Sequence, residues 1–128
     1  MLSEPAPELL AGALTTDGPL SVFVATNRTQ TPVGYVIVVP GPSAVYVPEI
    51  AVLPSSQREG HGSALLSRVG TYARNRSVDE IRLTVAASNK QARAFYDQHG
   101  FSEVERIPDR FETGEGVVLK KPLVDSRP

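Results

Sequence analysis

The chain has 128 residues, 41% of them hydrophobic and 21% charged, which is the composition of a folded globular protein rather than a disordered one. Its 13 Lys and Arg against 14 Asp and Glu give a formal net charge of -1, which removes the electrostatic basis for sequence-independent nucleic-acid binding. With no apolar run near the roughly 20 residues that span a bilayer and no secretion-signal pattern at its start, we expect one cytoplasmic domain over residues 1–128, with neither nucleic acid nor membrane as a partner.

The first predicted element is a short helix within residues 3–14, which together with a linker occupies residues 1–19. Four apolar residues recur there at helical spacing, and a breaker tripeptide, Asp17-Gly18-Pro19, follows them. Three segments rich in β-branched residues come next, at 20–25, 33–39 and 44–52. Short breaks rich in Pro, Gly and Asn separate them, which is typical of an antiparallel meander.

After Pro54 the period changes to that of a helix, with an apolar face made of Leu65, Leu66, Val69, Tyr72 and Ala73. A strand is predicted at 81–86 and a second helix at 89–98, which Gly100 ends in the left-handed conformation. Two last strands, at 101–107 and 116–121, are predicted to flank a polar loop that contains Pro108, Asp109, Glu112, Gly114 and Glu115.

The order strand, helix, strand over residues 44–86 is long enough for a right-handed crossover, which makes its two strands parallel. The predicted fold class is therefore α/β (equally described as α+β). It has a single mixed, mostly antiparallel sheet with a central parallel βαβ unit and flanking helices.

The loop of residues 57–63, between the third strand and the first long helix, contains Gly60 and Gly62. A glycine-rich turn at a helix N-terminus presents unpaired backbone N–H groups, and the helix dipole favours an anion there. Ser63 could cap the helix or donate to a phosphate. Taken alone, the segment also fits an ordinary capped turn. It is neither a Walker loop nor the dinucleotide G-x-G-x-x-G.

The second helix carries a small residue, two aromatic residues and an imidazole on one face: Ala92, Phe95, Tyr96 and His99 stand at i, i+3, i+4 and i+7. Aromatic residues at this spacing are usually core residues. Tyr96 nevertheless brings a hydroxyl group that needs a partner if it is buried.

Together the two segments resemble the GNAT superfamily of N-acetyltransferases. In that family the acetyl-CoA loop reads Q/R-x-x-G-x-G/A, and a later helix reads N-x-x-A-x-x-F-Y-x-x-x-G-F. The sequence supplies the first pattern with Gln57, Gly60 and Gly62. It supplies the second with Asn89, Ala92, Phe95, Tyr96, Gly100 and Phe101. The intervening strand and the spacing fit as well.

The resemblance implies the acyl-CoA N-acyltransferase fold and acetyl-CoA as cosubstrate, with no metal. It assigns the pyrophosphate to the backbone amides of Arg58, Glu59, Gly60, His61, Gly62 and Ser63. The pantetheine arm would pair with the strand end at Ile50, Ala51 and Val52, where a bulge parts this strand from its parallel neighbour, and Pro48 fits such an interrupted ladder. The remaining cofactor-binding candidates, which belong to the two motifs, are Gln57, Asn89, Ala92, Phe95 and Tyr96.

The 128 residues include no cysteine, which excludes acyl transfer through an acyl-cysteine of this sequence. We therefore expect direct attack of the amine on the thioester in a ternary complex. The catalytic candidates are Glu49 as general base, the Val52 backbone N–H as oxyanion donor, and Tyr96 as donor to the leaving thiolate. An equally supported interpretation is that Glu49 is a solvated or salt-bridged carboxylate of the strand, with no catalytic role. His61 and His99 are interpreted as structural or solvated residues.

Three basic residues, Lys90, Arg74 and Arg76, either contact a 3′-phosphate of the nucleotide or form a solvated basic face.

Members of the family usually place an additional strand and one or two helices before the meander, where these helices wall the acceptor site. The short segment here predicts an open acceptor side. Such a side would suit a small-molecule or peptide amine, could be completed by a second copy in a homodimer, or could reflect lost activity. The predicted function is transfer of acetyl from acetyl-CoA to a primary amine. The alternatives are a non-catalytic CoA-binding module acting as sensor or assembly subunit, and an unrelated anion-binding α/β domain.

Overall fold

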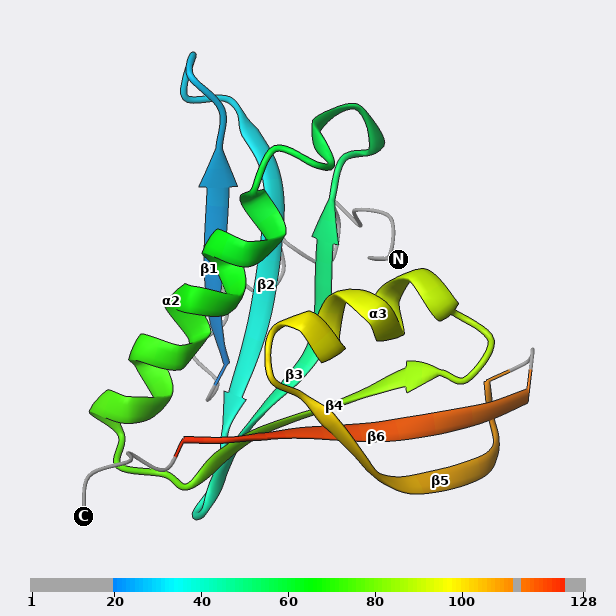
Figure 1. Ribbon diagram of the computed structural model, residues 1–128. Helices are drawn as coiled ribbons and strands as arrows, with labels where there is room; N and C mark the ends of the chain where they lie inside the picture. Colours follow the sequence, from blue (N-terminus) through cyan, green and yellow to red (C-terminus); the bar gives the residue numbers. More distant parts are fainter. Residues whose placement is uncertain (1–19, 112–113, 124–128) are drawn as a thin grey trace.

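A computed structural model describes residues 20–111 and 114–123, so the helix and linker predicted for residues 1–19 lie outside the described residues. The described chain forms one six-stranded sheet, two α-helices and a short 3₁₀ turn (Figure 1). In chain order these are β1 (Ser21–Thr26), β2 (Pro32–Pro40), β3 (Ala44–Val52), η1 (Pro54–Ser56), α2 (His61–Asn75), β4 (Glu80–Ala86), α3 (Lys90–Gln98), β5 (Ser102–Phe111) and β6 (Gly114–Pro122).

The sheet has the mixed topology predicted from the sequence, with the strand order β1-β2-β3-β4-β6-β5. The antiparallel meander is confirmed, because β1 pairs with β2 and β2 with β3 in opposite directions. The βαβ crossover is confirmed as well, because β3 and β4 are parallel. Their ladder has three residue pairs, ending at Tyr46 and Arg82, although β3 continues to Val52 and β4 to Ala86.

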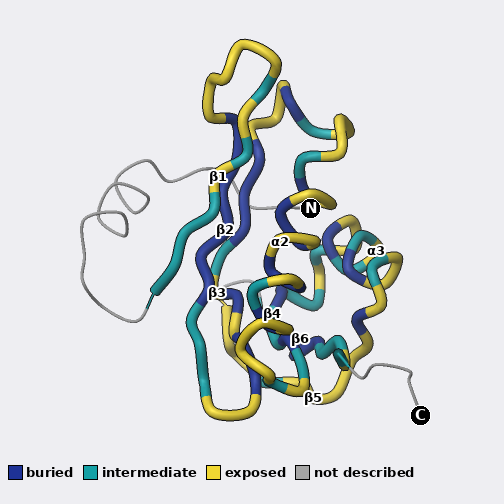
Figure 2. Tube along the Cα trace, turned by 90° about the vertical axis from the view of Figure 1, so that its left-hand side faces the viewer, coloured by how far each residue is buried: buried dark blue, intermediate teal, exposed yellow. Residues whose placement is uncertain are grey.

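Both α-helices lie on the same face of the sheet (Figure 1), and the main core fills the space beneath them. From α2 the core takes Leu65, Leu66, Val69 and Ala73, four of the five residues predicted for its apolar face. Figure 2 shows buried backbone running through β2 and β3, whereas β5 at the edge of the sheet is exposed. Within the two described segments, no helix is both long and apolar enough to cross a membrane.

A bulge in β3 explains why its ladder with β4 is short. Ile37 pairs with Glu49 and Val39 pairs with Tyr46, so Val47 and Pro48 together oppose the single residue between them on β2. An extra residue reverses which side chains face the core. Before the bulge the buried residues are Val45 and Val47, and after it they are Ile50 and Val52. The strand also bends there and leaves its parallel neighbour.

The predicted bounds of the polar loop between the last two strands are wrong at both ends. The strand β5 continues through Pro108 and Asp109 to Phe111, and β6 already begins at Gly114. Pairing is interrupted between Ile107 and Phe111, and Asp109 has a φ of +55°. A proline is tolerated on an edge strand, where its missing N–H breaks no ladder bond. The strand therefore continues past two residues that usually mark a turn, with an irregularity at Asp109.

Two glycines give opposite expectations for stability. Gly100 follows α3 with a φ of +91°, whereas Gly70 lies inside α2, where an added Cβ would meet only the end of the Arg74 side chain, 3.2 Å away. We expect Gly100→Ala to lower the free energy of unfolding by about 1–2 kcal/mol, because alanine is strained in the left-handed region. Gly70→Ala should raise it by up to about 1 kcal/mol, because alanine favours the helix. Urea denaturation measures both, and equal effects would contradict the assignment.

Candidate functional site

The site is built around the end of β3. Leu53 N–H donates to the Val33 carbonyl oxygen over 2.8 Å, which fixes the alternation of backbone hydrogen bonds between β2 and β3. By that alternation Glu49 and Ala51 direct their backbone polar groups toward β2, whereas Ile50 and Val52 direct theirs into the gap toward β4. The Gln57 amide Nε2 donates to the Val52 carbonyl oxygen over 3.1 Å and so ties the following loop to the strand end.

The loop after η1 takes two left-handed residues to reach the start of α2. Arg58 has a φ of +69°, and Gly60, the N-cap residue, has a φ of +90°. The first helical hydrogen bond runs from Ala64 N–H to the Gly60 carbonyl oxygen. The amides of the three residues before Ala64 therefore have no partner inside the helix, and they lie at the positive end of its dipole. This is an arrangement that accommodates an anion.

A cavity of about 470 Å³ lies between this loop and α3. Of the residues predicted to bind the cosubstrate, eight line it: Val52, Gln57, Arg58, Gly60, His61, Gly62, Ser63 and Phe95. The other lining residues were not among the predicted binding residues; they are Ser56, Gln91, Ala94, Gln98 and His99. Four of these five lie on α3 or at its C-cap, at i, i+3, i+7 and i+8, so a second helical stripe beside the apolar one could have indicated them.

His99 joins the two walls of the cavity. Its Nδ1 lies 2.8 Å from the Phe95 carbonyl oxygen, and its Nε2 lies 2.8 Å from the Ser63 hydroxyl oxygen. The first contact closes the C-terminal turn of α3, and the second reaches the first turn of α2. The interpretation of His99 as a structural residue fits these contacts.

Tyr96 does not line the cavity, although it was predicted to face the thioester. Its side chain is 5% exposed and belongs to the main core, in edge-to-face contact with Phe95 and Phe101. Burial raises the pKa of its hydroxyl group above the ordinary value. Among the described residues every fully buried side-chain N or O atom has a hydrogen-bond partner.

The side chains of four other residues predicted to contact the cosubstrate, on β3 and at α3, make contacts within the protein itself. The Asn89 side-chain oxygen accepts a hydrogen bond from Ala92 N–H over 3.1 Å and caps α3. Ala92 and Ile50 are buried in the main core, and Ala51 is buried on the opposite face of the sheet. None of these four residues lines the cavity, so Phe95 is the one residue of α3 that was predicted to contact the cosubstrate and also lines the cavity.

Glu49 lies on the sheet face away from the helices. Its carboxylate oxygen Oε2 accepts a 2.5 Å hydrogen bond from the Tyr35 hydroxyl group. Tyr35 is 2% exposed and packs with Ile37 and Ala51 in a second apolar cluster on that face. Tyr35 was not a predicted partner of Glu49, because the two residues are 14 positions apart and meet only through the register of β2 and β3.

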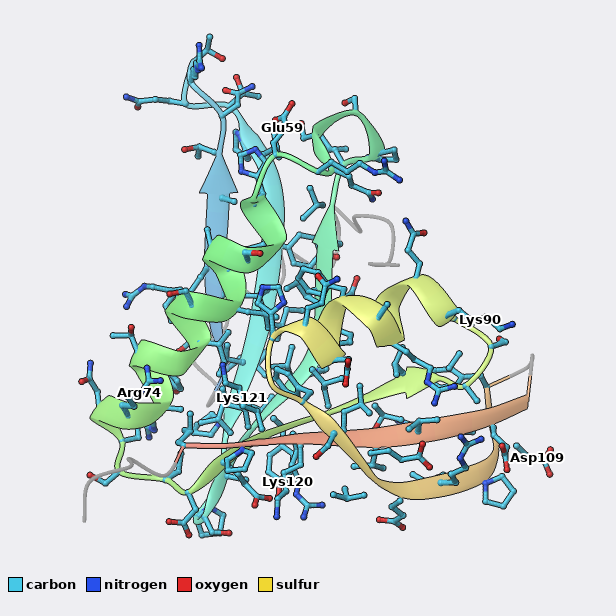
Figure 3. All side chains as sticks on the ribbon, viewed as in Figure 1. Glu59, Arg74, Lys90, Asp109, Lys120 and Lys121 are labelled. Carbon is cyan, nitrogen blue, oxygen red and sulfur yellow. The ribbon has the colours of Figure 1, made fainter. Side chains whose placement is uncertain are left out.

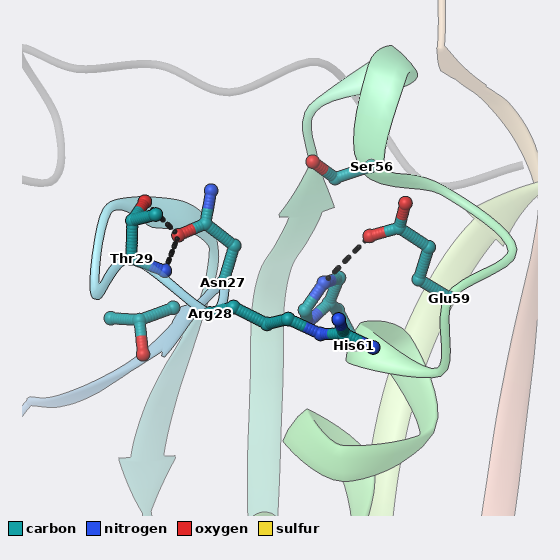
Figure 4. A pocket seen from close by; sticks show the side chains of 7 residues that line it. Asn27, Arg28, Thr29, Ser56, Glu59 and His61 are labelled. Carbon is teal, nitrogen blue, oxygen red and sulfur yellow. Dashed lines mark hydrogen bonds and ion pairs between the residues drawn. The ribbon is translucent and has the colours of Figure 1, made fainter.

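A second, more polar cavity of about 770 Å³ lies between the β1–β2 turn and the same loop (Figure 4). The His61 Nε2 and the Glu59 Oε1 lie 3.2 Å apart at its wall, within hydrogen-bonding distance, and Arg28 extends toward them from the turn. The turn is held by Asn27, whose side-chain oxygen accepts hydrogen bonds from Thr29 and Thr31. Glu59 lines this second cavity rather than the one beside α3.

The basic residues considered for a 3′-phosphate lie apart from the first cavity. Figure 3 shows Arg74 at the far end of α2 from Glu59, and a helix of 15 residues is about 22 Å long. Arg76 follows that end and packs its guanidinium over the Tyr72 ring. Lys90 begins α3 and lines a different hollow, on the β5 side of that helix. Among the described residues no group of His, Asp and Glu is placed to hold a metal ion.

The described residues form a mixed α/β fold in which a helix N-terminus, an arrangement suited to an anionic ligand, stands beside a parted parallel strand pair. The chain belongs to the acetyltransferase (GNAT) family, whose family model matches residues 2–101.

Sequence relatives agree with this membership. The chain is 40% identical to mycothiol acetyltransferase of Beutenbergia cavernae over 60 residues. The match covers 47% of this chain and 20% of that protein. It is 39% identical over 67 residues, 52% of its length, to the ribosomal protein bS18 alanine N-acetyltransferase of Escherichia coli. That match covers 45% of the relative, so the chain matches less than half of either protein.

Solved structures share the fold. The ribosomal-protein-S18-alanine N-acetyltransferase of Escherichia coli superposes with a TM-score of 0.80 at 24% identity, over 95% of this chain and 79% of that one. A GNAT family acetyltransferase from Elizabethkingia anophelis with acetyl-CoA bound superposes with a TM-score of 0.78 at 19% identity, over 92% of this chain and 84% of that one.

The hydrogen bond between Tyr35 and Glu49 predicts a measurable stability loss. We expect Tyr35→Phe to lower the free energy of unfolding at pH 7 by about 1–2 kcal/mol, because a half-buried carboxylate loses its donor. Tyr46→Phe is the matched control, since Tyr46 is 44% exposed and its change should stay within about 0.5 kcal/mol. A double-mutant cycle with Glu49→Gln isolates the pair, and a coupling energy near zero would contradict its importance.

Proposed function

We propose that this chain is an N-acetyltransferase that transfers the acetyl group of acetyl-CoA to a primary amine by direct attack in a ternary complex. The observation that carries the proposal is the cavity beside α3, which is lined by residues of the α2 start and by Arg58 together with the apolar side chains of Phe95 and Val52. The helix-start amides suit a pyrophosphate, and the apolar lining suits a pantetheine arm. The proposed domain is the whole chain, residues 1–128.

The proposed donor side uses backbone atoms more than side chains. The pyrophosphate accepts hydrogen bonds from the amides of the loop and of the first turn of α2. The pantetheine arm lies along β3 in the gap that opens after Tyr46, where it replaces the missing strand pairing. The Val52 N–H, which points into this gap, is the proposed donor to the oxyanion.

In the proposed step the amine nitrogen attacks the thioester carbonyl carbon. The C–N bond forms, the C–S bond breaks, and CoA leaves as a thiolate. The ammonium proton is lost to Glu49, directly or through a water molecule. At pH 7 this deprotonation costs about 4.6 kcal/mol for a lysine-like amine and about 1.1 kcal/mol for an α-amine, so the need for a base depends on the acceptor.

Tyr96 is the proposed hydrogen-bond donor to the departing thiolate. Full proton transfer from an ordinary phenol to a thiolate is already uphill by roughly 2 kcal/mol. Burial of Tyr96 raises the pKa of its hydroxyl further, which makes complete transfer still less favourable. We therefore assign Tyr96 a neutral donor role, in which it stabilises the developing charge without becoming ionised.

The proposed acceptor side is the sheet face that carries Glu49. A cavity of about 400 Å³ lies on it where β3 leaves β4, lined by Tyr46, Pro48, Thr84 and Phe111 among others. An amine entering there would approach the thioester from the face opposite the cosubstrate cavity. A second copy of the chain could complete this side, as proposed from the sequence.

The acceptor is proposed to be a small-molecule or peptide amine. One relative acetylates an alanine of a ribosomal protein, and alanine has its only amine at the α position, so an α-amine acceptor is the first to test. The alternative function is a CoA-binding module without turnover. Calorimetric binding of acetyl-CoA, with no thiol release in the presence of varied amines, would favour that alternative. Failure to bind CoA at all would contradict both functions.

Tyr96→Phe should keep acetyl-CoA affinity within about twofold and lower turnover by one to three orders of magnitude, because it removes one hydroxyl from a core position. Tyr72→Phe is the control for removing a tyrosine hydroxyl from a helix, since Tyr72 packs with Phe23 and Arg76. Calorimetry measures binding and a thiol-release assay measures turnover. Unchanged turnover of the Tyr96 variant would remove Tyr96 from the mechanism.

Glu49→Gln should affect two kinds of amine unequally. With alaninamide as an α-amine probe and Nα-acetyl-lysinamide as an ε-amine probe, we expect the loss of amine-dependent thiol release to be at least about tenfold greater for the ε-amine, because its deprotonation is costlier. The ratio of the two losses separates a base from a merely structural carboxylate. An equal loss with both probes would assign Glu49 to structure alone.

A further inference from the structure

The two hydrogen bonds of His99 determine where the Ser63 proton points. The Phe95 carbonyl can only accept, so the His99 Nδ1 carries a hydrogen atom. In the neutral imidazole the Nε2 is then bare, and it accepts the Ser63 hydroxyl proton across 2.8 Å. Ser63 has one proton, so its oxygen presents lone pairs alone to the cavity that both residues line.

Protonation of His99 reverses this bond. The Nε2–H becomes a donor, the Ser63 oxygen accepts from it, and the Ser63 proton is released toward the cavity. An anion at the start of α2 is repelled by lone pairs in the first state. In the second state it gains a hydroxyl donor and a nearby positive charge. The two states therefore differ in affinity for a phosphate group.

We propose that His99 and Ser63 form a proton-linked grip on the pyrophosphate of acyl-CoA, so that binding of the cosubstrate takes up a proton at His99. This inference rests on the proposed function, which places the pyrophosphate at the helix start. By linkage, a ligand that binds the protonated state better must bind more tightly as the pH falls through the range where histidines titrate.

Other charged groups face the same region, and the test must separate them from His99. Arg58 and His61 line the cavity, and His61 is paired with Glu59. Asp97 stands on α3 itself, and the Lys121 side chain of β6 lies beside Gly100. Of these groups only His61 is a second imidazole, so it is the necessary control.

The experiment measures binding of dephospho-CoA by calorimetry in buffers of contrasting ionisation enthalpy. Dephospho-CoA lacks the 3′-phosphate, a group that itself titrates near pH 6 and would obscure the result. For the unmodified chain we expect uptake of roughly 0.3–0.5 proton per complex near neutral pH. The affinity should be about three- to tenfold higher at pH 5.5 than at pH 8.

Two substitutions at position 99 separate the two ring nitrogens. His99→Gln places an amide near the position of Nε2, where it can donate to Ser63 at any pH, so affinity should lose its pH dependence without a large loss of strength. His99→Asn keeps a donor near the Nδ1 position for the Phe95 carbonyl but loses the contact with Ser63. It should bind about three- to tenfold more weakly than the unmodified chain at pH 5.5.

Two further variants test whether the proton uptake depends on Ser63 and not on His61. Ser63→Ala should lose most of the proton uptake, and His61→Gln should retain it. Uptake that persists in His99→Gln, or that is unchanged in Ser63→Ala, would overturn the inference, because the proton would then belong elsewhere or act through charge alone. Binding of acetyl-CoA and dephospho-CoA without proton uptake overturns the inference but not the proposed function. Binding of neither overturns both.

Discussion

The structure depends on one bulge, in which Val47 and Pro48 of β3 oppose a single residue of β2. Without the extra residue, the alternation of β3 would continue from Val45 and Val47 and would place Glu49 under the helices. Burying an unpaired carboxylate there would cost several kcal/mol. With the bulge, Ile50 and Val52 fill the core and Glu49 reaches the Tyr35 hydroxyl group on the other face.

The same bulge produces the gap beside β4, and the loop at the top of β3 follows from it. The chain leaves Val52 at the gap, Gln57 holds the loop against the strand end, and Gly60 begins α2 in a left-handed conformation. The helix start therefore faces the strand edge that lost its partner. The helix-start amides and the strand edge that has parted from β4 come together because one distortion positions both, and α3 completes the cavity through its contact with α2.

Much of the fold could be predicted from the sequence, because its periodicity changes cleanly between strands and helices. The crossover was recognisable for the same reason, and the two motif segments were recognisable through their resemblance to the family. The continuation of the edge strand β5 beyond Ile107 was not predicted, because Pro108 and Asp109 signal a turn locally, whereas the ladder with β6 resumes at Phe111. The partnership of Tyr35 with Glu49 depends on the register set by the bulge. The cavity side of α3 was hidden because Gln91, Ala94 and Gln98 look like an ordinary solvated stripe beside an apolar one.

A chain segment without cysteine must bring donor and acceptor together at the same moment if it transfers an acyl group directly. A closed sheet would keep the Glu49 face and the helix face apart, because a continuous ladder leaves no passage between strands. The three-pair ladder of β3 and β4 removes that barrier at one place. Beyond that ladder Val52 directs its backbone polar groups into the gap, between the Glu49 carboxylate on one face of the sheet and the cavity beside α3 on the other. The geometry that interrupts the sheet is therefore also the geometry that direct transfer requires.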